Sequence, residues 1–427
     1  MRNFFDIVSF EYKKLFKRKS TMISLFLLFM IAAFTAILSV KSHFYWHQDS
    51  ERSSFEAMQL DREVIRSKAG VMDEAFIKEV IEQNTIMISS DENYYIDHGR
   101  RVGSKFDSYI KYVLPYKTAV DIINSIYEAN TKNLATDGFQ IINTSEIKPI
   151  DTLTVKDGEN FYAAIKQVST EYINSLSALS QKEKEKHLEM LSNVKTPYYN
   201  DHYDGYMYFD KHLKVIALIL MITIAICISP IFANEYYLKT DRIILSSKHG
   251  KGKAIFAKLF TGVTFSAGVS FLTLFGFLLA ILLIHGFEGG NMAIQTISVY
   301  STYPLTLLKA TLIAIAVTVF ISLLFGMLVM LLSSCFNSSF LVITVSFLLL
   351  FLPGLFHVSP KDRLLYQLFQ VFPAKATEFP NIYSEYLFEV LGLVFTPATF
   401  YIIFSIVISL LIIPIAKRTF KNHQIVE

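Results

Sequence analysis

The sequence predicts an α-helical polytopic membrane protein with six transmembrane helices and a polar domain inserted between helices 1 and 2. The 427 residues are 52% apolar and 14% aromatic, and the mean hydropathy is positive, at +0.39. Only 18% are charged, against about a quarter in an average soluble domain. The apolar residues also gather into runs of about 20, the length that a helix needs to cross the hydrocarbon core. Because backbone polar groups in lipid must be paired within the segment, helices are expected.

The first apolar run, Thr21–Val40, contains no charged residue. Basic residues precede it, as in a signal peptide, but the run exceeds the ~7–15 residues of a signal core and no small-residue cleavage site follows. We therefore predict a retained transmembrane helix over residues 21–40. Five further spans are expected within residues 212–416: Leu213–Ala233, Leu259–Ile284, Pro304–Leu332, Ser339–His357 and Pro397–Ala416.

The distribution of Lys and Arg predicts the orientation. Residues 1–20 and 232–258 carry six each and the tail 417–427 carries three, whereas 286–303 carries none and 358–396 carries three. Cytoplasmic loops are enriched in these residues. We therefore expect both termini and a segment at 234–258 to be cytoplasmic.

Residues 41–211 form the most polar part of the chain, and this topology places them outside the cytoplasm. They contain 20 Lys and Arg against 27 Asp and Glu, a net charge of −7. A segment of this length can bury its own core. Helical spacing over Phe161–Leu191 and alternation over Phe139–Gly158 predict an α/β or mainly helical domain.

Motifs of enzyme chemistry are missing from the sequence. The stretch "HGKGKA" has Ser247 in place of the first glycine of a P-loop and Ala254 in place of its Ser or Thr. His43 and His47 have a spacing compatible with metal binding, but no third ligand stands in fixed register. Neither of the two cysteines lies in the inserted domain, so no disulfide is expected there. We predict a non-enzymatic chain with no catalytic, cofactor-binding or metal-binding residues of its own.

Two amphipathic segments flank the spans on the predicted cytoplasmic side. Read as one helix, Glu235–Ser247 presents an exposed apolar ridge with one acid, suited to a lipid surface or a partner's groove. This ridge consists of Tyr237, Leu238, Asp241, Ile244 and Leu245.

Residues 1–20 are expected to form an interfacial helix, since their basic residues would lie beside an anionic leaflet. Its predicted interfacial residues are Phe4, Ile7, Glu11, Lys13, Lys14 and Leu15.

These segments resemble the ABC-2 type permease family, the transmembrane subunits of ABC transporters. The resemblance rests on "FEYKKLFKRK" before the first span, "IFANEYYLKTDRIILSSKHGKGKAIFAKL" after the second, "FQVFPAKATEFP" before the last and "KRTFKN" after it. It implies a bacterial cell membrane location, re-entrant helices at 358–396, and a second permease as homodimer or heterodimer partner. It also implies a coupling helix that contacts a separate ATPase subunit, which uses ATP and Mg²⁺. The implied contact residues are Glu235, Tyr237, Leu238, Asp241, Arg242, Ile244 and Leu245.

The insert of 171 residues departs from compact family members. It resembles a Gram-positive subgroup that includes sodium-efflux and peptide-toxin or bacteriocin-immunity permeases. We therefore expect an exporter of a peptide or amphiphile. The lipid bilayer is an expected partner, and no nucleic acid is expected to bind. Sodium efflux, or peptide sensing through the external domain, are the alternatives.

Overall fold

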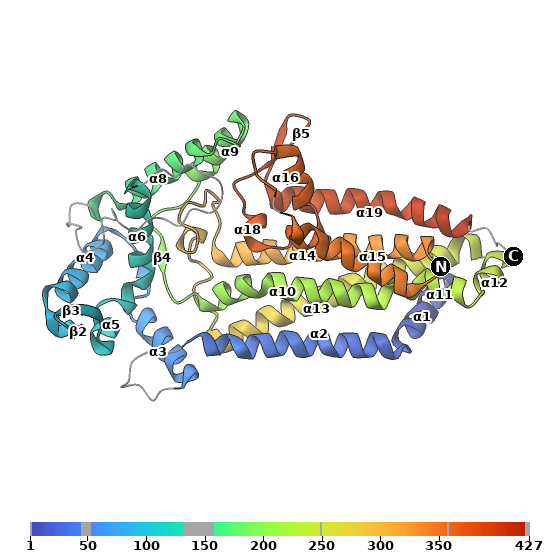
Figure 1. Ribbon diagram of the computed structural model, residues 1–427, viewed down its shortest axis with the longest axis horizontal. Helices are drawn as coiled ribbons and strands as arrows, with labels where there is room; N and C mark the ends of the chain where they lie inside the picture. The colour runs from blue at the N-terminus through green and yellow to red at the C-terminus, as the bar shows by residue number, and fades with distance from the viewer. Residues whose placement is uncertain (1, 44–52, 132–157, 248–249, 357, 423–427) are drawn as a thin grey trace.

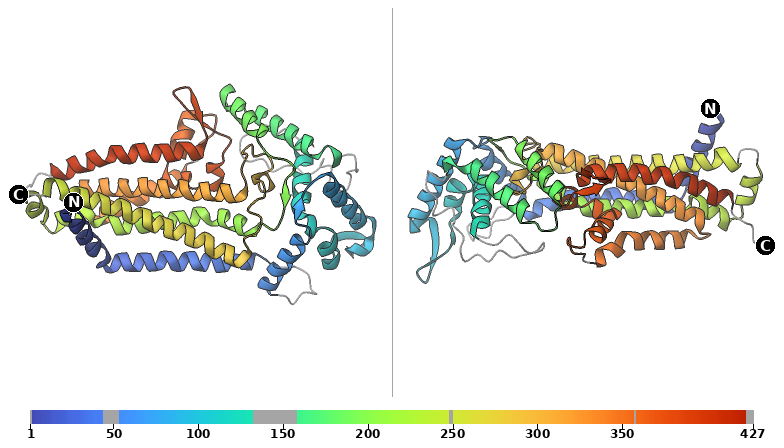
Figure 2. Two further views of the ribbon diagram at one scale, coloured as in Figure 1. Left: turned by 180° about the vertical axis from the view of Figure 1, so that it is seen from behind. Right: turned by 90° about the horizontal axis from the view of Figure 1, so that it is seen from above.

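The computed structural model describes residues 2–43, 53–131, 158–247, 250–356 and 358–422. A long helical bundle carries a smaller helical domain at one end (Figure 1). We call this end of the bundle the domain end. The opposite end, where both chain termini lie, is the terminal end (Figures 1 and 2). The alternation predicted over 139–157 and His47 fall outside the described residues.

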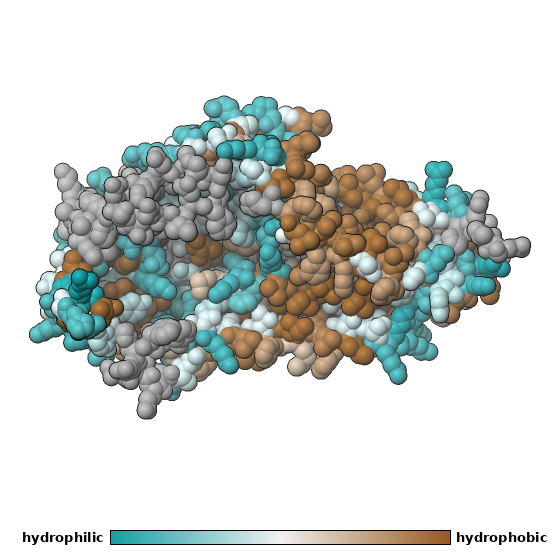
Figure 3. Space-filling view, in the orientation of Figure 1, coloured by the Kyte–Doolittle hydropathy of each residue, from teal (hydrophilic) through white to brown (hydrophobic). Residues whose placement is uncertain are grey.

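Among the described residues, five helical segments are long and apolar enough to cross a membrane, and they match five of the six predicted spans. On the face that Figure 3 shows, their exposed side chains form a hydrophobic belt across the bundle, with hydrophilic surface on both sides of it. This is the surface expected of a membrane-embedded helical protein. The segments are α2 (Lys19–Leu38) with η1 (Ser39–Ser42), α10 (Asp204–Ile228) with α11 (Pro230–Tyr237), α13 (Ile255–His285), α14 (Leu307–Cys335) and α19 (Pro397–Lys421).

The predicted fifth span, Ser339–His357, is a shorter apolar helix. Its α-helical part, α15 (Ser339–Phe351), has 13 residues and passes into the 3-10 turn η8 (Leu352–Leu355). At ~1.5 Å per residue α15 is about 20 Å long, less than the ~30 Å hydrocarbon core. Pro353 within the turn explains why the α-helix ends there, because proline cannot continue the backbone ladder. Of the six predicted spans, five are therefore long helices among the described residues, and the predicted fifth is a shorter apolar helix, Ser339–Leu355.

Helix α14 lies at the centre of the bundle and contacts α10, α13, α15 and α19. Glycines let α13 and α14 approach closely. A Cβ added at Gly262 would lie 2.2 Å from the Met330 sulfur, and one at Gly326 would lie 2.5 Å from the Ser266 hydroxyl oxygen. Small residues have this role in membrane helix packing.

The second long helix begins earlier than predicted. Helix α10 starts at Asp204, so residues 204–211 belong to the bundle. Tyr206, Tyr208 and Phe209 are buried in this first part, which explains the extension. We therefore call residues 54–203 the inserted domain.

The inserted domain is mainly helical. Among its described residues, 54–131 and 158–203, the helices are α3 (Ser54–Arg66), α4 (Glu74–Ser89), α5 (Phe106–Tyr112), α6 (Lys117–Thr131), α8 (Phe161–Ser175) and α9 (Gln181–Ser192). In the same residues two antiparallel pairs accompany them: β1 (Gly70–Val71) with β4 (Tyr199–Asn200), and β2 (Tyr94–Asp97) with β3 (Arg100–Ser104). Its core joins α4, α6 and α8 through residues such as Ile77, Ile122 and Ile165. The helix predicted over Phe161–Leu191 forms as two, because Ser180 and Glu183 make a capping box that starts α9.

Two segments of the bundle fix the inserted domain in place. The connection between α13 and α14 packs Val299 and Tyr300 against the domain core, and the Tyr300 hydroxyl donates to the Ser125 carbonyl at 2.7 Å. Helix α9 contacts residues 363–395, where Arg363 forms an ion pair with Glu183. The latter region consists of α16 (Arg363–Gln370), α17 (Pro373–Ala376), α18 (Phe379–Ile382) and the hairpin of β5 (Phe388–Val390) with β6 (Leu393–Phe395).

Candidate functional site

The segment predicted to contact an ATPase lies at the terminal end, but it is not a single helix. Helix α11 ends at Tyr237, and a separate helix, α12 (Asp241–Ser246), follows after three residues. Lys239 lies between them with a left-handed φ of +56°. The Thr240 amide donates to the Glu235 carbonyl at 2.9 Å and the Lys239 amide to the Tyr236 carbonyl at 3.0 Å. This is the Schellman arrangement that ends helices, with lysine at the position where glycine is usual.

The helix break changes which predicted contact residues are exposed. Tyr237 and Leu238 are 76% and 56% exposed, as the prediction requires, and Arg242 is also exposed. Glu235 and Asp241 are buried instead.

On α12 the exposed apolar residue is Ile243, at 71%, whereas Ile244 and Leu245 are half-buried. In one continuous helix, Ile243 would lie outside the predicted ridge. The left-handed turn at Lys239 rotates α12 relative to α11 and so changes which residues of α12 are exposed. The exposed apolar surface is therefore Tyr237, Leu238 and Ile243, which we call the terminal ridge.

Beneath the terminal ridge lies a buried ion-pair network of Glu11, Lys14, Glu235 and Lys258. The Lys258 ammonium, 1% exposed, lies 2.8 Å from both the Glu11 and the Glu235 carboxylates. It also donates to the Ile231 carbonyl at 3.2 Å. Lys14 pairs with Glu235, whose other oxygen accepts from the Thr240 hydroxyl. Because buried charges are costly unless they are paired, this network holds three elements, α1 (Arg2–Phe16), α11 and α13, in one arrangement.

Helix α11 is also attached to the end of α14. The Ser333 hydroxyl accepts from the amides of Phe232 and Ala233, both at 3.0 Å, and donates to the Ser229 carbonyl at 2.6 Å. The Tyr236 hydroxyl donates to the Ser334 carbonyl at 2.9 Å. A displacement of α11 therefore acts directly on α14.

Helix α1 differs from the interfacial helix that the sequence predicts, because its predicted apolar side is packed against the bundle. The predicted apolar side packs on α13, with Glu11 and Leu15 buried and Phe4 and Ile7 half-buried. The Tyr12 hydroxyl lies 2.7 Å from that of Thr264. Lys13 is exposed and Lys14 faces the ion-pair network. Helix α1 leaves the direction of α2 and projects from the side of the bundle (Figure 2), with three exposed phenylalanines: Phe5, Phe10 and Phe16.

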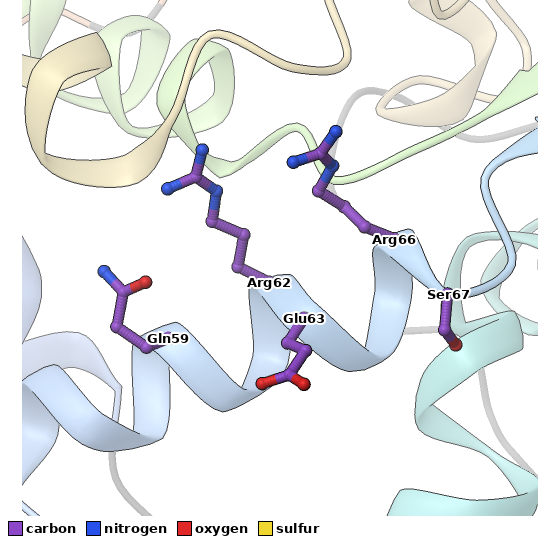
Figure 4. A pocket seen from close by; sticks show the side chains of 5 residues that line it. All are labelled: Gln59, Arg62, Glu63, Arg66 and Ser67. Carbon is purple, nitrogen blue, oxygen red and sulfur yellow. The ribbon is translucent and has the colours of Figure 1, made fainter.

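A shallow groove of about 660 Å³ lies over α3 in the inserted domain. Its lining residues are Gln59, Arg62, Glu63, Arg66 and Ser67 (Figure 4). The two guanidinium groups point away from α3 on the same side (Figure 4). Both pair with Glu288, Arg66 at 2.8 Å, so they attach α3 to the connection that follows α13. The groove is therefore a docking contact rather than a free anion site.

Within the described part of the chain, one group of side chains has donor atoms close enough to hold a metal ion: His43, Asp204 and His285. They come from three segments far apart in sequence, which is why sequence spacing gave no signal beyond His43. Lys258 was likewise missed, because its partners Glu11 and Glu235 lie on other helices. Comparisons with protein-family models, with curated proteins and with solved structures find no match for this chain.

Proposed function

We propose that this chain is the membrane-spanning permease subunit of an ATP-driven exporter of the ABC-2 type, and that a separate ATPase subunit binds its terminal ridge. The observation that carries the proposal is the ridge itself. Three large apolar side chains, Tyr237, Leu238 and Ile243, are exposed where α11 ends and α12 begins, at the terminal end of the bundle (Figure 1). Exposed apolar side chains held on a fixed scaffold are typical of protein interfaces.

The connections of the terminal ridge supply a route from ATPase to bundle. Helix α11 continues α10, is attached to α14 through Ser333, and is joined to α13 through Lys258. A movement imposed on the ridge would therefore reach three central helices through direct contacts, the kind of contiguous network that carries coupling. The same arrangement fits a coupling segment better than a helix that only rests on lipid.

The cargo we propose is a cationic, membrane-active peptide or similar amphiphile. Residues 41–211 carry a net charge of −7, which would raise the local concentration of cations near the domain. The five long segments are lined mainly by apolar, Ser and Thr side chains, which suit an amphiphile better than a hydrated ion. Sodium is the alternative cargo.

A sensing role for the inserted domain is a second candidate. Helix α9 contacts the bundle through His187, whose ring nitrogens lie 2.7 Å from the Thr302 hydroxyl and 2.7 Å from the Glu385 carbonyl oxygen. A ligand that moved α9 would therefore act on the segment before α19.

The test is co-purification of an ATPase from the native host in mild detergent. The tagged chain should retain a protein that hydrolyses ATP. Replacing Tyr237, Leu238 and Ile243 by alanine should remove it, since buried interface anchors commonly cost more than ~1 kcal/mol each. A matched triple of exposed leucines at the domain end, Leu364, Leu391 and Leu393, should leave association unchanged when replaced by alanine.

Equal retention of the ATPase by both triple variants would contradict the proposal. In that case the terminal ridge would be a lipid-facing surface. For the cargo, co-expression with the ATPase should raise the tolerance of a sensitive strain to cationic peptides. Unchanged tolerance with faster sodium extrusion would favour the alternative cargo.

A further inference from the structure

Four polar residues gather where the inserted domain meets the bundle. His43 follows η1 at the end of α2, Asp204 begins α10, and His285 is the last residue of α13. His202 lies just before α10. We call these four residues the histidine cluster. The three histidines are 8%, 1% and 0% exposed for His43, His202 and His285.

In the histidine cluster, two imidazole nitrogens converge on one carboxylate oxygen. The Nε2 atoms of His43 and His202 lie 3.4 Å and 3.3 Å from the same carboxylate oxygen, Oδ2 of Asp204. Neither nitrogen has a hydrogen-bond partner, and neither does Nδ1 of His285. Ligands bound to zinc at ~2.0–2.1 Å in a tetrahedron are separated from one another by roughly 3.3–3.4 Å. The two separations from Oδ2 of Asp204 match this value, and the donor atoms of His43, Asp204 and His285 all lie within 4.8 Å of one another.

His43 and His285 each have a hydrogen-bond partner that sets the tautomer of the ring. Nδ1 of His43 lies 3.3 Å from the Asp61 carboxylate, to which it donates, and this leaves a lone pair on Nε2. The Ser39 hydroxyl donates to the Ala36 carbonyl at 2.7 Å and accepts from Nε2 of His285 at 2.6 Å. His285 therefore keeps its lone pair on Nδ1. Metal-binding histidines commonly have such partners, which orient the ring toward the ion.

Burial makes the free lone pairs costly without a ligand. A buried polar atom left unpaired loses its hydration with no compensation, and the cluster has three of them. A divalent cation bound by His43, Asp204 and His285 would satisfy two of them, Nε2 of His43 and Nδ1 of His285, and its charge would balance the carboxylates of Asp61 and Asp204. The side chains of these two acids are 20% and 15% exposed, which leaves a path for an ion to enter.

The position of Asp61 ties the histidine cluster to the inserted domain. Its neighbour Arg62 pairs with Glu288, and Arg66 pairs with the same glutamate. Helix α3 is therefore held against the connection after α13, and Asp61 is held with it. An ion in the cluster would join α2, α10 and α13 directly, and α3 through Asp61.

We propose that His43, Asp204 and His285 bind a zinc ion, and that this site fastens the inserted domain to the bundle. Imidazole and carboxylate donors in tetrahedral arrangement are those that zinc takes in proteins. Asp61 and Ser39 are positioning residues that hold His43 and His285.

The experiment is a zinc titration of the full-length protein in detergent, with a histidine-free tag, after removal of metal by a chelator. Competition against a chromophoric chelator gives stoichiometry and affinity. We expect one zinc per chain. His43→Ala and His285→Ala should each weaken binding by more than about 100-fold, and Asp61→Asn by about 10–100-fold, the range typical of positioning partners. The control His212→Gln, on α10, should bind as the parent does, because Nδ1 of His212 already contacts the Tyr208 carbonyl at 2.8 Å.

Two further measurements keep the result decisive if a variant folds poorly. Zinc should raise the unfolding temperature of the parent, since binding to the folded state alone is stabilising, and should not raise that of His43→Ala. His43→Cys retains a ligand, so with cobalt in place of zinc it should show a thiolate absorption band that the parent lacks. Failure of the folded parent to retain zinc, or unchanged affinity in the double variant His43→Ala/His285→Ala, would overturn the proposal.

Discussion

At the residue scale, the ion pairs of Lys258 predict a large dependence of stability on one side chain. The ammonium group is buried between the carboxylates of Glu11 and Glu235. Lys258→Met would leave both carboxylates buried without their shared cation, and breaking a buried pair in this way costs about 3–5 kcal/mol. We therefore expect that loss in the free energy of unfolding, measured by denaturant titration in mixed micelles. The exposed Lys253, on the preceding turn, serves as the control. Lys253→Met should change the free energy of unfolding by less than about 0.5 kcal/mol.

A compensating variant sharpens this prediction. Replacing Glu11 and Glu235 by apolar residues in the Lys258→Met background should recover much of the loss, because exchanging a whole buried ion pair for packed apolar groups is often neutral. Equal stability of Lys258→Met and Lys253→Met would show that the network does not form.

His187 predicts a pH dependence of the contact between α9 and the bundle. Burial lowers the pKa of His187 below its ordinary value of 6.5, so the docked side chain stays neutral. As the pH falls below about 6.5, the undocked state takes up a proton that the docked state does not. The free energy of opening α9 should therefore decrease with falling pH, by at most ~1.4 kcal/mol per pH unit. Hydrogen exchange of α9 amides, corrected for intrinsic rates, measures it.

The neighbouring acids confine the pH window for this test. Burial raises the pKa values of Glu183 and Glu385 above 4.5, so these groups favour the docked state at lower pH. The His187 effect should therefore be measured just below pH 6.5, the ordinary pKa of histidine, where the undocked imidazole begins to take up its proton. His187→Gln should remove the slope there, and substitution of the fully exposed His98 should preserve it. A slope that survives in His187→Gln would assign it to another group.

The sequence analysis could not predict the histidine cluster or the ion-pair network of Lys258. Periodicity relates residues within one helix, whereas His43, Asp204 and His285 come from three helix ends. Glu11 was expected on a face of the N-terminal helix, but nothing in its surroundings in the sequence indicated Lys258. Only the packing of α1 on α13 brings these charges together.

At the scale of elements, the left-handed turn at Lys239 predicts an unusual response to glycine. A non-glycine residue in this conformation costs roughly 1–2 kcal/mol, which exceeds the extra entropy that glycine loses on folding, about 0.5–1 kcal/mol. Lys239→Gly should therefore raise the free energy of unfolding by about 0.5–1 kcal/mol. In the continuous helix expected from the sequence, glycine would instead lower it by about 1 kcal/mol. Lys239→Val should destabilise, because a branched side chain disfavours positive φ.

The sequence predicts some elements better than others. Long apolar runs give a strong signal for a helix, whereas a helix break depends on one or two residues. Apolar runs of about 20 residues predicted the five long helices, but their boundaries were predicted less well: α10 starts at Asp204, whereas this span was predicted from Leu213. The break at Lys239 carried no glycine or proline to announce it. The end of α15 did carry such a signal, Pro353 followed by Gly354, but the apolar run on both sides outweighed it.

At the scale of the whole molecule, the two ends of the bundle differ in charge. Basic side chains gather at the terminal end, on α1, α12 and the end of α19, while residues 41–211 carry a net charge of −7. Basic segments beside spans remain in the cytoplasm. The hydrophobic belt separates these two regions (Figure 3). The proposed orientation therefore places the inserted domain and the histidine cluster on the outer side and the terminal ridge inside.

Accessibility of single cysteines tests this orientation. In a background with Cys227→Ala and Cys335→Ser, Ser177→Cys lies on an exposed connection of the inserted domain and Ser246→Cys on the exposed end of α12. An impermeant maleimide should label Ser177→Cys in intact cells, and should label Ser246→Cys only after the membrane is opened, because the hydrophobic belt lies between the two positions. The reverse pattern would invert the orientation and move the ATPase contact to the wrong side. Labelling of both positions in intact cells would contradict a chain that spans the membrane between them.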